Sequence, residues 1–187
     1  MKTNDEYLSL NRLYYPVKTL GPGDRVGIWT TGCIRNCRGC ISPELQAYDL
    51  SKEVLVNDVL RMIATIKSPI DGFTISGGEP FYKPKAMRIL IDSLFERCDD
   101  IIIFTGYTLD ELKELKNEDI NSTLEKCAVL VDGPFIKELN DGKGLRGSSN
   151  QKCHVFRHHD KYSDIEVEGR QLQTVVYDGK VLNIGIP

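Results

Sequence analysis

An alternation of short apolar strands and amphipathic helices predicts an α/β fold built on a parallel sheet for this 187-residue chain. Three apolar strands are expected at 73–76, 101–105 and 128–131, and their starts lie about 28 residues apart, the length of one strand–helix unit. A complete eight-unit barrel takes about 250 residues, whereas this chain can supply about four to six units. The expected architecture is therefore an open, partial TIM-like barrel.

Two further strand regions lie on either side of these three. The segment 25–30 (RVGIWT) is expected to form the first core strand. Near the end of the chain, the runs 171–177 and 180–184 flank Asp178-Gly179, a dipeptide that favours the type I′ turn of a β-hairpin. This C-terminal hairpin is expected to close an edge of the fold.

Three helices are expected between the strands. Ser51 can cap the first helix, Pro84 suits the first turn of the second, and Thr108 with Glu111 forms a capping-box pattern at the start of the third. The apolar face of the first helix would comprise Leu55, Val59, Met62, Ile63 and Ile66. Helices of this kind supply the crossover connections of a parallel sheet.

Composition and charge exclude several classes of protein. The chain has 24 Lys and Arg residues against 27 Asp and Glu, a net charge of −3, and no block of basic residues, so no nucleic-acid partner is expected. No apolar run approaches the roughly 20 residues of a membrane span, so no membrane partner is expected. The first six residues carry acids where a signal peptide needs an apolar stretch, which predicts a cytoplasmic protein.

Three of the six cysteines, Cys33, Cys37 and Cys40, stand close together in the pattern C-x3-C-x2-C. In a reducing compartment such a cluster indicates a metal site, and thiolates favour zinc or iron–sulfur centres. Structural zinc sites and complete iron–sulfur sites usually take four protein ligands. Three local ligands therefore leave one position open, which on an iron–sulfur cluster could take a substrate or cofactor.

The other three cysteines are scattered along the chain. Cys98 is expected at a helix end and Cys127 just before a strand, where both would be packing thiols. Cys153 is followed closely by three histidines, and these four side chains could form a second metal site. Such neighbours are more often surface or packing residues. These histidines are His154, His158 and His159.

Chemically suggestive loops follow each of the four expected core strands. The cysteine loop comes after the first strand, and Gly77-Gly78-Glu79-Pro80 comes after the second. Gly106-Tyr107 follows the third strand and Asp132-Gly133-Pro134 the fourth. Because ligands on parallel sheets bind at the carboxyl ends of the strands, these loops are expected to surround one site.

Taken together, these motifs resemble the radical S-adenosylmethionine (SAM) superfamily. C-x3-C-x2-C is the signature of that superfamily, and Gly77-Gly78-Glu79-Pro80 matches its GGEP motif. The segment 21–25 resembles the glycine-rich entry of the activating-enzyme branch. The Gly39-Cys40 ending and the segments 104–108, 131–135 and 146–151 resemble the anaerobic ribonucleotide reductase activating proteins. The resemblance covers residues 18–151, so one domain is expected over 1–187, with 152–187 as an extension of unknown role.

The resemblance implies a 4Fe–4S cluster on Cys33, Cys37 and Cys40, with the amino and carboxylate groups of SAM on the fourth iron. Reductive cleavage of SAM would yield a 5′-deoxyadenosyl radical. The implied activase would then take a hydrogen from a backbone glycine of a glycyl radical enzyme, an anaerobic ribonucleotide reductase. An electron donor such as flavodoxin or ferredoxin would reduce the cluster.

The resemblance also implies contacts to SAM. The backbone at Gly39 and Ile41 would meet adenine, and Gly77 and Gly78 would let the methionine moiety approach closely. Glu79 would bind the ammonium group or hold its loop in place. The remaining expected contacts are Cys40, Thr105, Asp132, Ser148 and Asn150.

Two other functions stay open at this point. A stand-alone radical SAM enzyme could act on a peptide or small metabolite, and the tail 152–187 could cover that substrate. An iron–sulfur electron carrier or a zinc-binding adaptor would use the cysteines alone, and it would leave the glycine-rich loops unexplained.

Overall fold

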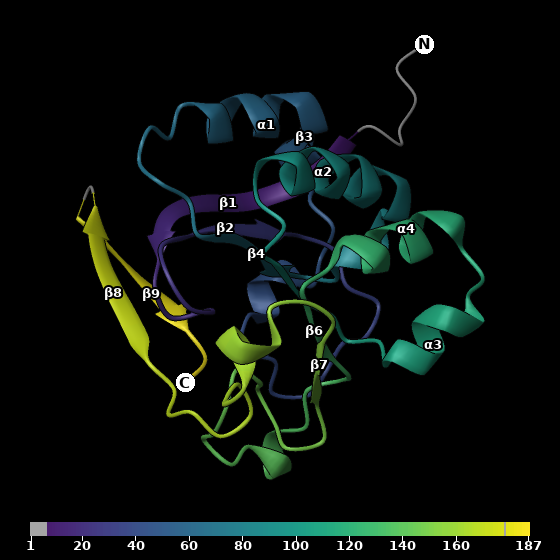
Figure 1. Cartoon of the computed structure of the whole chain (residues 1–187), viewed down its shortest axis with the longest axis vertical. Helices are drawn as coiled ribbons and strands as arrows, with labels where there is room; N and C mark the ends of the chain where they lie inside the picture. The colour runs from purple at the N-terminus through teal and green to yellow at the C-terminus, as the bar shows by residue number, and fades with distance from the viewer. Residues whose placement is uncertain (1–6, 178) are drawn as a thin grey trace.

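A seven-stranded mixed sheet forms the centre of the computed structural model, which describes residues 7–177 and 179–187 (Figure 1). The strand order is β3-β1-β2-β4-β5-β6-β7. The four central strands run parallel: β2 (Arg25–Thr30), β4 (Gly72–Gly77), β5 (Ile101–Phe104) and β6 (Val129–Asp132). Three strands extend the sheet antiparallel at its edges: β1 (Tyr7–Val17), β3 (Glu53–Leu55) and β7 (Lys152–Val155).

The α/β class and the four core strands are confirmed, each strand within one residue of its predicted bounds. The predicted parallel sheet is confirmed for these four strands, whereas the strands added on either side of them pair antiparallel. The long strand β1 was not predicted, since polar residues such as Asn11 and Arg12 interrupt its apolar pattern. It reaches β2 through a short loop at 18–24, and so short a connection permits only antiparallel pairing.

Within the described residues, four α-helices accompany the sheet: α1 (Val56–Ala64), α2 (Pro84–Arg97), α3 (Leu109–Glu114) and α4 (Glu118–Lys126). Pro84 opens α2 as predicted, and Thr108 and Glu111 form both hydrogen bonds of the predicted capping box on α3. The helix α4, which Asn117 caps, was not predicted.

The predicted start of the first helix is wrong. Ser51 lies in a short 3-10 turn, where its backbone N–H donates to the side chain of Asp49. The chain then forms the short strand β3, and α1 begins only at Val56. Met62 is 40% exposed, so it lies off the buried face of α1, which Val59 and Ile63 form.

The two faces of the sheet are covered by different parts of the chain. Ile101 and Ile103 of β5 pack with the helices, whereas the intervening Ile102 packs with Tyr162 and Ile165 from the C-terminal tail. This alternation follows from the two-residue period of a strand. The helices therefore cover one face of the sheet, and the tail covers the other.

The predicted C-terminal hairpin is confirmed as a separate two-stranded sheet, β8 (Leu172–Tyr177) and β9 (Lys180–Gly185). Of its predicted turn, Asp178 lies outside the described residues, and Gly179 has the positive φ of 69° that such a turn requires. Leu182 and Ile184 are buried beside Trp29. Figure 1 shows the yellow hairpin on the left, apart from the helices at the top and right.

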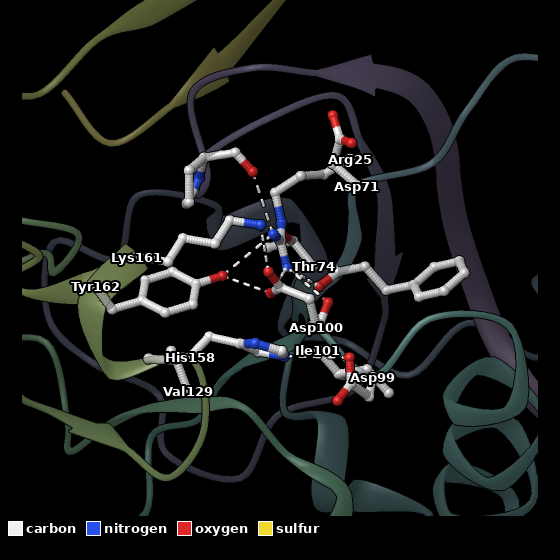
Figure 2. A network of polar contacts seen from close by, with 12 residues as sticks. Arg25, Asp71, Thr74, Asp99, Asp100, Ile101, Val129, His158, Lys161 and Tyr162 are labelled. Carbon is white, nitrogen blue, oxygen red and sulfur yellow. Dashed lines mark hydrogen bonds and ion pairs between the residues drawn. The ribbon is translucent and has the colours of Figure 1, made fainter.

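A buried ion pair joins the tail to the amino ends of the core strands (Figure 2). Arg25, at the start of β2, is fully buried and donates to Asp100 Oδ1 at 3.0 Å and to Thr74 Oγ1 at 2.8 Å. From the tail, Tyr162 and Lys161 both donate to the Asp100 carboxylate. This network lies at the end of the sheet opposite to the cysteine loop.

No helix within residues 7–177 and 179–187 is both long enough and apolar enough to cross a membrane.

Candidate functional site

The three clustered cysteines lie on a loop at the carboxyl end of β2. The backbone N–H groups of Gly32 and Cys33 donate to the carbonyls of Leu45 and Gln46 at 2.9 and 2.8 Å, which closes the loop at its base. Inside the loop, the N–H of Cys40 donates to the carbonyl of Cys37 at 3.2 Å. All three thiols are half-buried and free.

A cavity of about 490 Å³ opens in front of these thiols, a size within the range of small-molecule sites. Several of the predicted site residues line it together: Cys33, Cys37, Cys40, Ile41, Gly77, Gly78 and Thr105. They come from the loops after β2, β4 and β5, as the carboxyl-end argument predicts. The sequence motifs thus converge on one space although they lie far apart along the chain.

Gly39 lies in the cysteine loop but outside the cavity lining. Its φ of +73° is left-handed, and a Cβ there would lie 3.0 Å from the side chain of Lys137. Asn36 also has a positive φ, of 46°. The two left-handed residues turn the chain sharply on either side of Cys37, which sets the spacing of the three thiols.

Gly77 and Gly78 allow the loop after β4 to pack against the base of the cysteine loop. A Cβ on Gly77 would lie 2.3 Å from the carbonyl oxygen of Thr30, and one on Gly78 would lie 2.4 Å from that of Gly32. The N–H groups of Gly78 and Glu79 donate to these same two oxygens. Side chains at either glycine would force the two loops apart.

The buried carboxylate of Glu79 joins the loops after β4 and β5. Its Oε1 accepts from Phe81 N at 3.0 Å and from Thr105 Oγ1 at 2.8 Å, and its Oε2 accepts from Gly106 N at 2.8 Å. Burial raises the pKa of Glu79, against the opposing effect of these hydrogen bonds. Of the two roles suggested for Glu79, the structure shows the one that holds the loop.

Arg35, inside the cysteine loop, was not predicted as a site residue. Its guanidinium carbon lies 4.2 Å from the centre of the Tyr107 ring, and Nη2 donates to the Glu111 carboxylate. Its Nε is buried and has no hydrogen-bond partner among the described residues. The hydrogen bond from Arg35 is the main reason that the pKa of Glu111 is lowered. Arg35 therefore ties the cysteine loop to the start of α3.

Asp132, at the end of β6, lies beside the cavity rather than in its lining. Its carboxylate accepts from Leu109 N at 2.7 Å and from Lys152 N at 3.2 Å, and it pairs with His154 Nε2 at 2.8 Å. These contacts give Asp132 a structural role at the edge of the site.

Ser148 and Asn150 also lie outside the cavity lining. The hydroxyl of Ser148 accepts from Ile136 N at 3.1 Å, and Asn150 Nδ2 donates to the carbonyl of Pro134 at 2.8 Å. Asn150 Oδ1 is buried without a hydrogen-bond partner in the described part of the chain. Both side chains hold the loop after β6 in place.

Some further lining residues were not predicted as site residues, although Gln151 belongs to the family-like segment 146–151. Gln151 lines the cavity and fixes two loops, because its Oε1 accepts from Gly147 N at 2.7 Å and its Nε2 donates to Gly133 O at 2.7 Å. The tail contributes Leu172 and residues 183–187. The only earlier signal for the tail was the hairpin pattern itself, which says nothing of where the hairpin packs.

The scattered cysteines are not gathered with the cluster. Cys127 is fully buried, and burial raises the pKa of its thiol to about 12, as expected of a core thiol. Beyond Cys153, the rings of His154 and His158 face the carboxylates of Asp132 and Asp99. Across 7–177 and 179–187, no three His, Cys, Asp or Glu side chains are grouped to hold a single metal ion.

A larger cavity, of about 640 Å³, lies between the loop before β2 and the tail. Lys18, Tyr162 and Arg170 are among its lining residues, and none of the predicted site residues is. The motif-bearing loops therefore single out the cysteine cavity.

Comparison with known proteins identifies the family. Residues 19–154 match the family model described as "4Fe-4S single cluster domain". The anaerobic ribonucleoside-triphosphate reductase-activating protein of Escherichia coli K12 is 30% identical over 77% of this chain and 97% of its own length. The chain belongs to this family of activating proteins.

Other activating proteins of this family are equally similar. That of Haemophilus influenzae is 33% identical over 77% of this chain and 96% of its own length, and that of phage T4 is 31% identical over 78% and 92%. Among solved structures, QueE from Escherichia coli aligns with 58% of this chain and 59% of its own, with a TM-score of 0.45 and 15% identity. That likeness is too partial to bear on fold or function.

The cysteine cavity fits the cluster that the activating-protein family implies. Each thiolate of a 4Fe–4S cluster binds a different iron, so the thiols need only surround a shared space, as these three do. Burial raises the pKa of Cys33, against hydrogen bonds from the backbone of Arg35 and Asn36 that lower it. Thiolates are the binding form, so cluster assembly would release protons from these thiols.

Proposed function

We propose that this protein activates an anaerobic ribonucleotide reductase by placing a glycyl radical on it. The bound 4Fe–4S cluster and SAM would supply one-electron cleavage to methionine and a 5′-deoxyadenosyl radical, which takes a hydrogen atom from a glycine Cα and becomes 5′-deoxyadenosine. One observation carries the proposal: the C-x3-C-x2-C thiols and the Gly-Gly loop line the same cavity in a chain of the activating-protein family.

Cys33, Cys37 and Cys40 would hold the cluster and leave its fourth iron for SAM. Ile41, Thr105 and the backbone at Gly77 and Gly78 line the remaining space, where they would orient SAM and exclude water. The other predicted contact residues, Gly39, Glu79, Asp132, Ser148 and Asn150, would act by positioning the loops that form this wall.

Three further parts of the proposal concern the setting of the site. The sheet would curve as part of an open barrel, so that the tail lies on its concave face. An electron donor of the flavodoxin or ferredoxin class would reduce the cluster. The reaction would take place in the cytoplasm, where thiol ligands stay reduced.

The position of the tail favours a second candidate. Leu172 and Ile184 line the cavity, so the tail could cover a small substrate instead. The protein would then be a stand-alone radical SAM enzyme that modifies a peptide or small metabolite.

The deciding experiment is anaerobic reconstitution with iron and sulfide, reduction, and addition of SAM and purified anaerobic ribonucleotide reductase. We expect 5′-deoxyadenosine and a glycyl radical signal on the reductase by electron paramagnetic resonance. The Cys37→Ala variant should lose cluster and radical, whereas Cys98→Ala, a matched thiol at the end of α2, should keep both.

Two outcomes would contradict the proposal. Cluster loss in both variants would refute the assignment of the ligands. Cleavage of SAM by the wild type without any radical on the reductase would favour the stand-alone enzyme.

A further inference from the structure

The β8–β9 hairpin forms one wall of the cysteine cavity although it lies outside the region that matches the family. The match covers residues 19–154, whereas the hairpin occupies 172–185. The Escherichia coli relative is aligned over 97% of its length but over only 77% of this chain. This protein therefore adds a wall to the site that the family likeness does not account for.

The hairpin is fixed firmly in this position. Its side chains Leu182 and Ile184 are buried against the sheet. The Gln173 side chain donates to the carbonyl of Pro16 at 2.9 Å and accepts from the N–H of Lys18 at 3.0 Å, so it joins the hairpin to the end of β1. In Figure 1 the hairpin lies beside the end of β1, on the left of the molecule.

Two exposed apolar side chains from distant parts of the sequence line the cavity. Leu172, at the start of β8, is 59% exposed and lines the cavity. Ile41, in the cysteine loop, is 44% exposed and lines the same cavity. Both side chains are apolar and accessible where they line the cavity, so a partner that enters the cavity can bury them.

We propose that Leu172 and Ile41 receive the glycine-bearing segment of the partner reductase, bound in an extended conformation across the cavity mouth. The inference rests on the proposed function, which requires a backbone Cα of a large protein to reach the cavity. In an extended segment the side chains two positions before and two positions after the glycine point to the glycine's own side, where they can contact these two side chains. Glycine has no side chain of its own, so its Cα can approach closest.

The hairpin would thereby select the partner. A segment with apolar residues two positions before and after its glycine would bury Leu172 and Ile41, whereas charged residues at those positions would place charge against the two apolar side chains. The tail would act in recognition of the partner, and the cysteine and Gly-Gly loops would hold the cofactors.

The test compares Leu172→Glu with Val176→Glu. Val176 lies on the same strand and the same side, is 69% exposed, and is not among the cavity-lining residues, so it controls for adding a charge to the hairpin. Both variants would be reconstituted as holoenzyme. Glycyl radical yield would be measured against the concentrations of reductase and of SAM, and folding would be checked by thermal unfolding.

For Leu172→Glu we expect about a tenfold rise in the half-saturating concentration of reductase, equivalent to about 1.4 kcal/mol. The half-saturating concentration of SAM should change much less. Val176→Glu should stay within about twofold of the wild type. Equal half-saturating concentrations of reductase for the two variants would overturn the role of Leu172. An equal rise in the half-saturating concentration of SAM would also overturn it, because that result would place Leu172 at the cofactor. A wild type that cleaves SAM but makes no glycyl radical would instead refute the proposed function, and this inference with it.

Discussion

At the scale of single residues, Glu79 shows how one buried carboxylate can join the loops of a site. Its two oxygens accept three hydrogen bonds from two different loops. A carboxylate can only accept, so it suits a point where three donors meet. The GGEP motif therefore has a structural reason for its acid in this protein.

Replacing Glu79 with Ala should destabilise the protein. The change leaves Phe81 N, Gly106 N and the Thr105 hydroxyl without their acceptor, and each buried unpaired group costs about 1–3 kcal/mol. We expect a loss of about 3 kcal/mol or more in the free energy of unfolding, measured by denaturant titration of the apoprotein.

Glu79→Gln should recover only part of that loss, because an amide has one accepting oxygen and places N–H donors against donors. Glu96→Ala, on the exposed side of α2, should change the free energy by no more than about 0.5 kcal/mol. A Glu79→Ala protein as stable as the wild type would show that these hydrogen bonds make no net contribution to the free energy of unfolding.

At the scale of elements, the link from Arg35 to α3 holds the cysteine loop. Arg35 lies over Tyr107 and pairs with Glu111, which also accepts from Thr108 N in the capping box. One glutamate thus caps the start of the helix and anchors the cysteine loop. The cysteine loop depends on a helix that begins about seventy residues later in the chain.

Arg35→Met should weaken retention of the cluster more than it weakens the fold. Partly exposed ion pairs contribute only about 0–1 kcal/mol to stability, whereas residues that orient metal ligands typically change metal retention by about tenfold or more. We expect the reconstituted variant to release iron to a chelator about tenfold faster. Arg38→Met, exposed in the same loop, should match the wild type, and equal release rates for the two variants would contradict the role of Arg35.

The sequence predicts some elements better than others for physical reasons. The core strands are short runs rich in apolar residues, each with a glycine at its end or within two residues after it, and burial on both faces produces the apolar pattern. The antiparallel strands β1 and β7 are buried less completely, so their sequences carry a weaker signal. The motifs locate the cavity, but long-range contacts such as those of Arg35 and Leu172 depend on packing that no local pattern encodes.

At the scale of the whole molecule, the Arg25–Asp100 pair joins the tail to the sheet at the end remote from the site. Burial alone would raise the pKa of Asp100, but the Arg25 guanidinium and hydrogen bonds from Lys161 and Tyr162 hold it below its usual value. Parallel α/β sheets commonly place stabilising contacts at this end and chemistry at the other.

Breaking the Arg25–Asp100 pair should lower the free energy of unfolding but leave the cysteine loop intact. Arg25→Met removes the fully buried partner of the Asp100 carboxylate and leaves it paired with Lys161 and Tyr162, and breaking a buried ion pair costs about 3–5 kcal/mol. Thermal unfolding would measure the loss, and the cysteines should still assemble a cluster at low temperature. A variant that unfolds like the wild type would contradict the assigned role of the pair.

The same pair predicts a dependence of stability on pH. The pKa of Asp100 is lower in the folded state than in the unfolded state. Asp100 therefore makes its full contribution to the free energy of unfolding above the unfolded-state pKa of about 3.9, and this contribution is lost as the pH falls through the folded-state pKa. Unfolding followed from pH 7 downward should show a shallower acid loss for Asp100→Asn than for the wild type. Asp164→Asn, which changes an exposed acid of the tail, should follow the wild-type curve.

The contact between the loops at 30–32 and 77–79 determines which parts must be moved together if such a site is transplanted into another scaffold. Two N–H groups of the second loop donate to carbonyls at the base of the first, and both glycines are required at that contact. The cysteine loop moved alone would bring its ligands without the backbone that supports them. The smallest portable unit is the pair of neighbouring parallel strands with both loops, since the geometry of the thiols belongs to the pair.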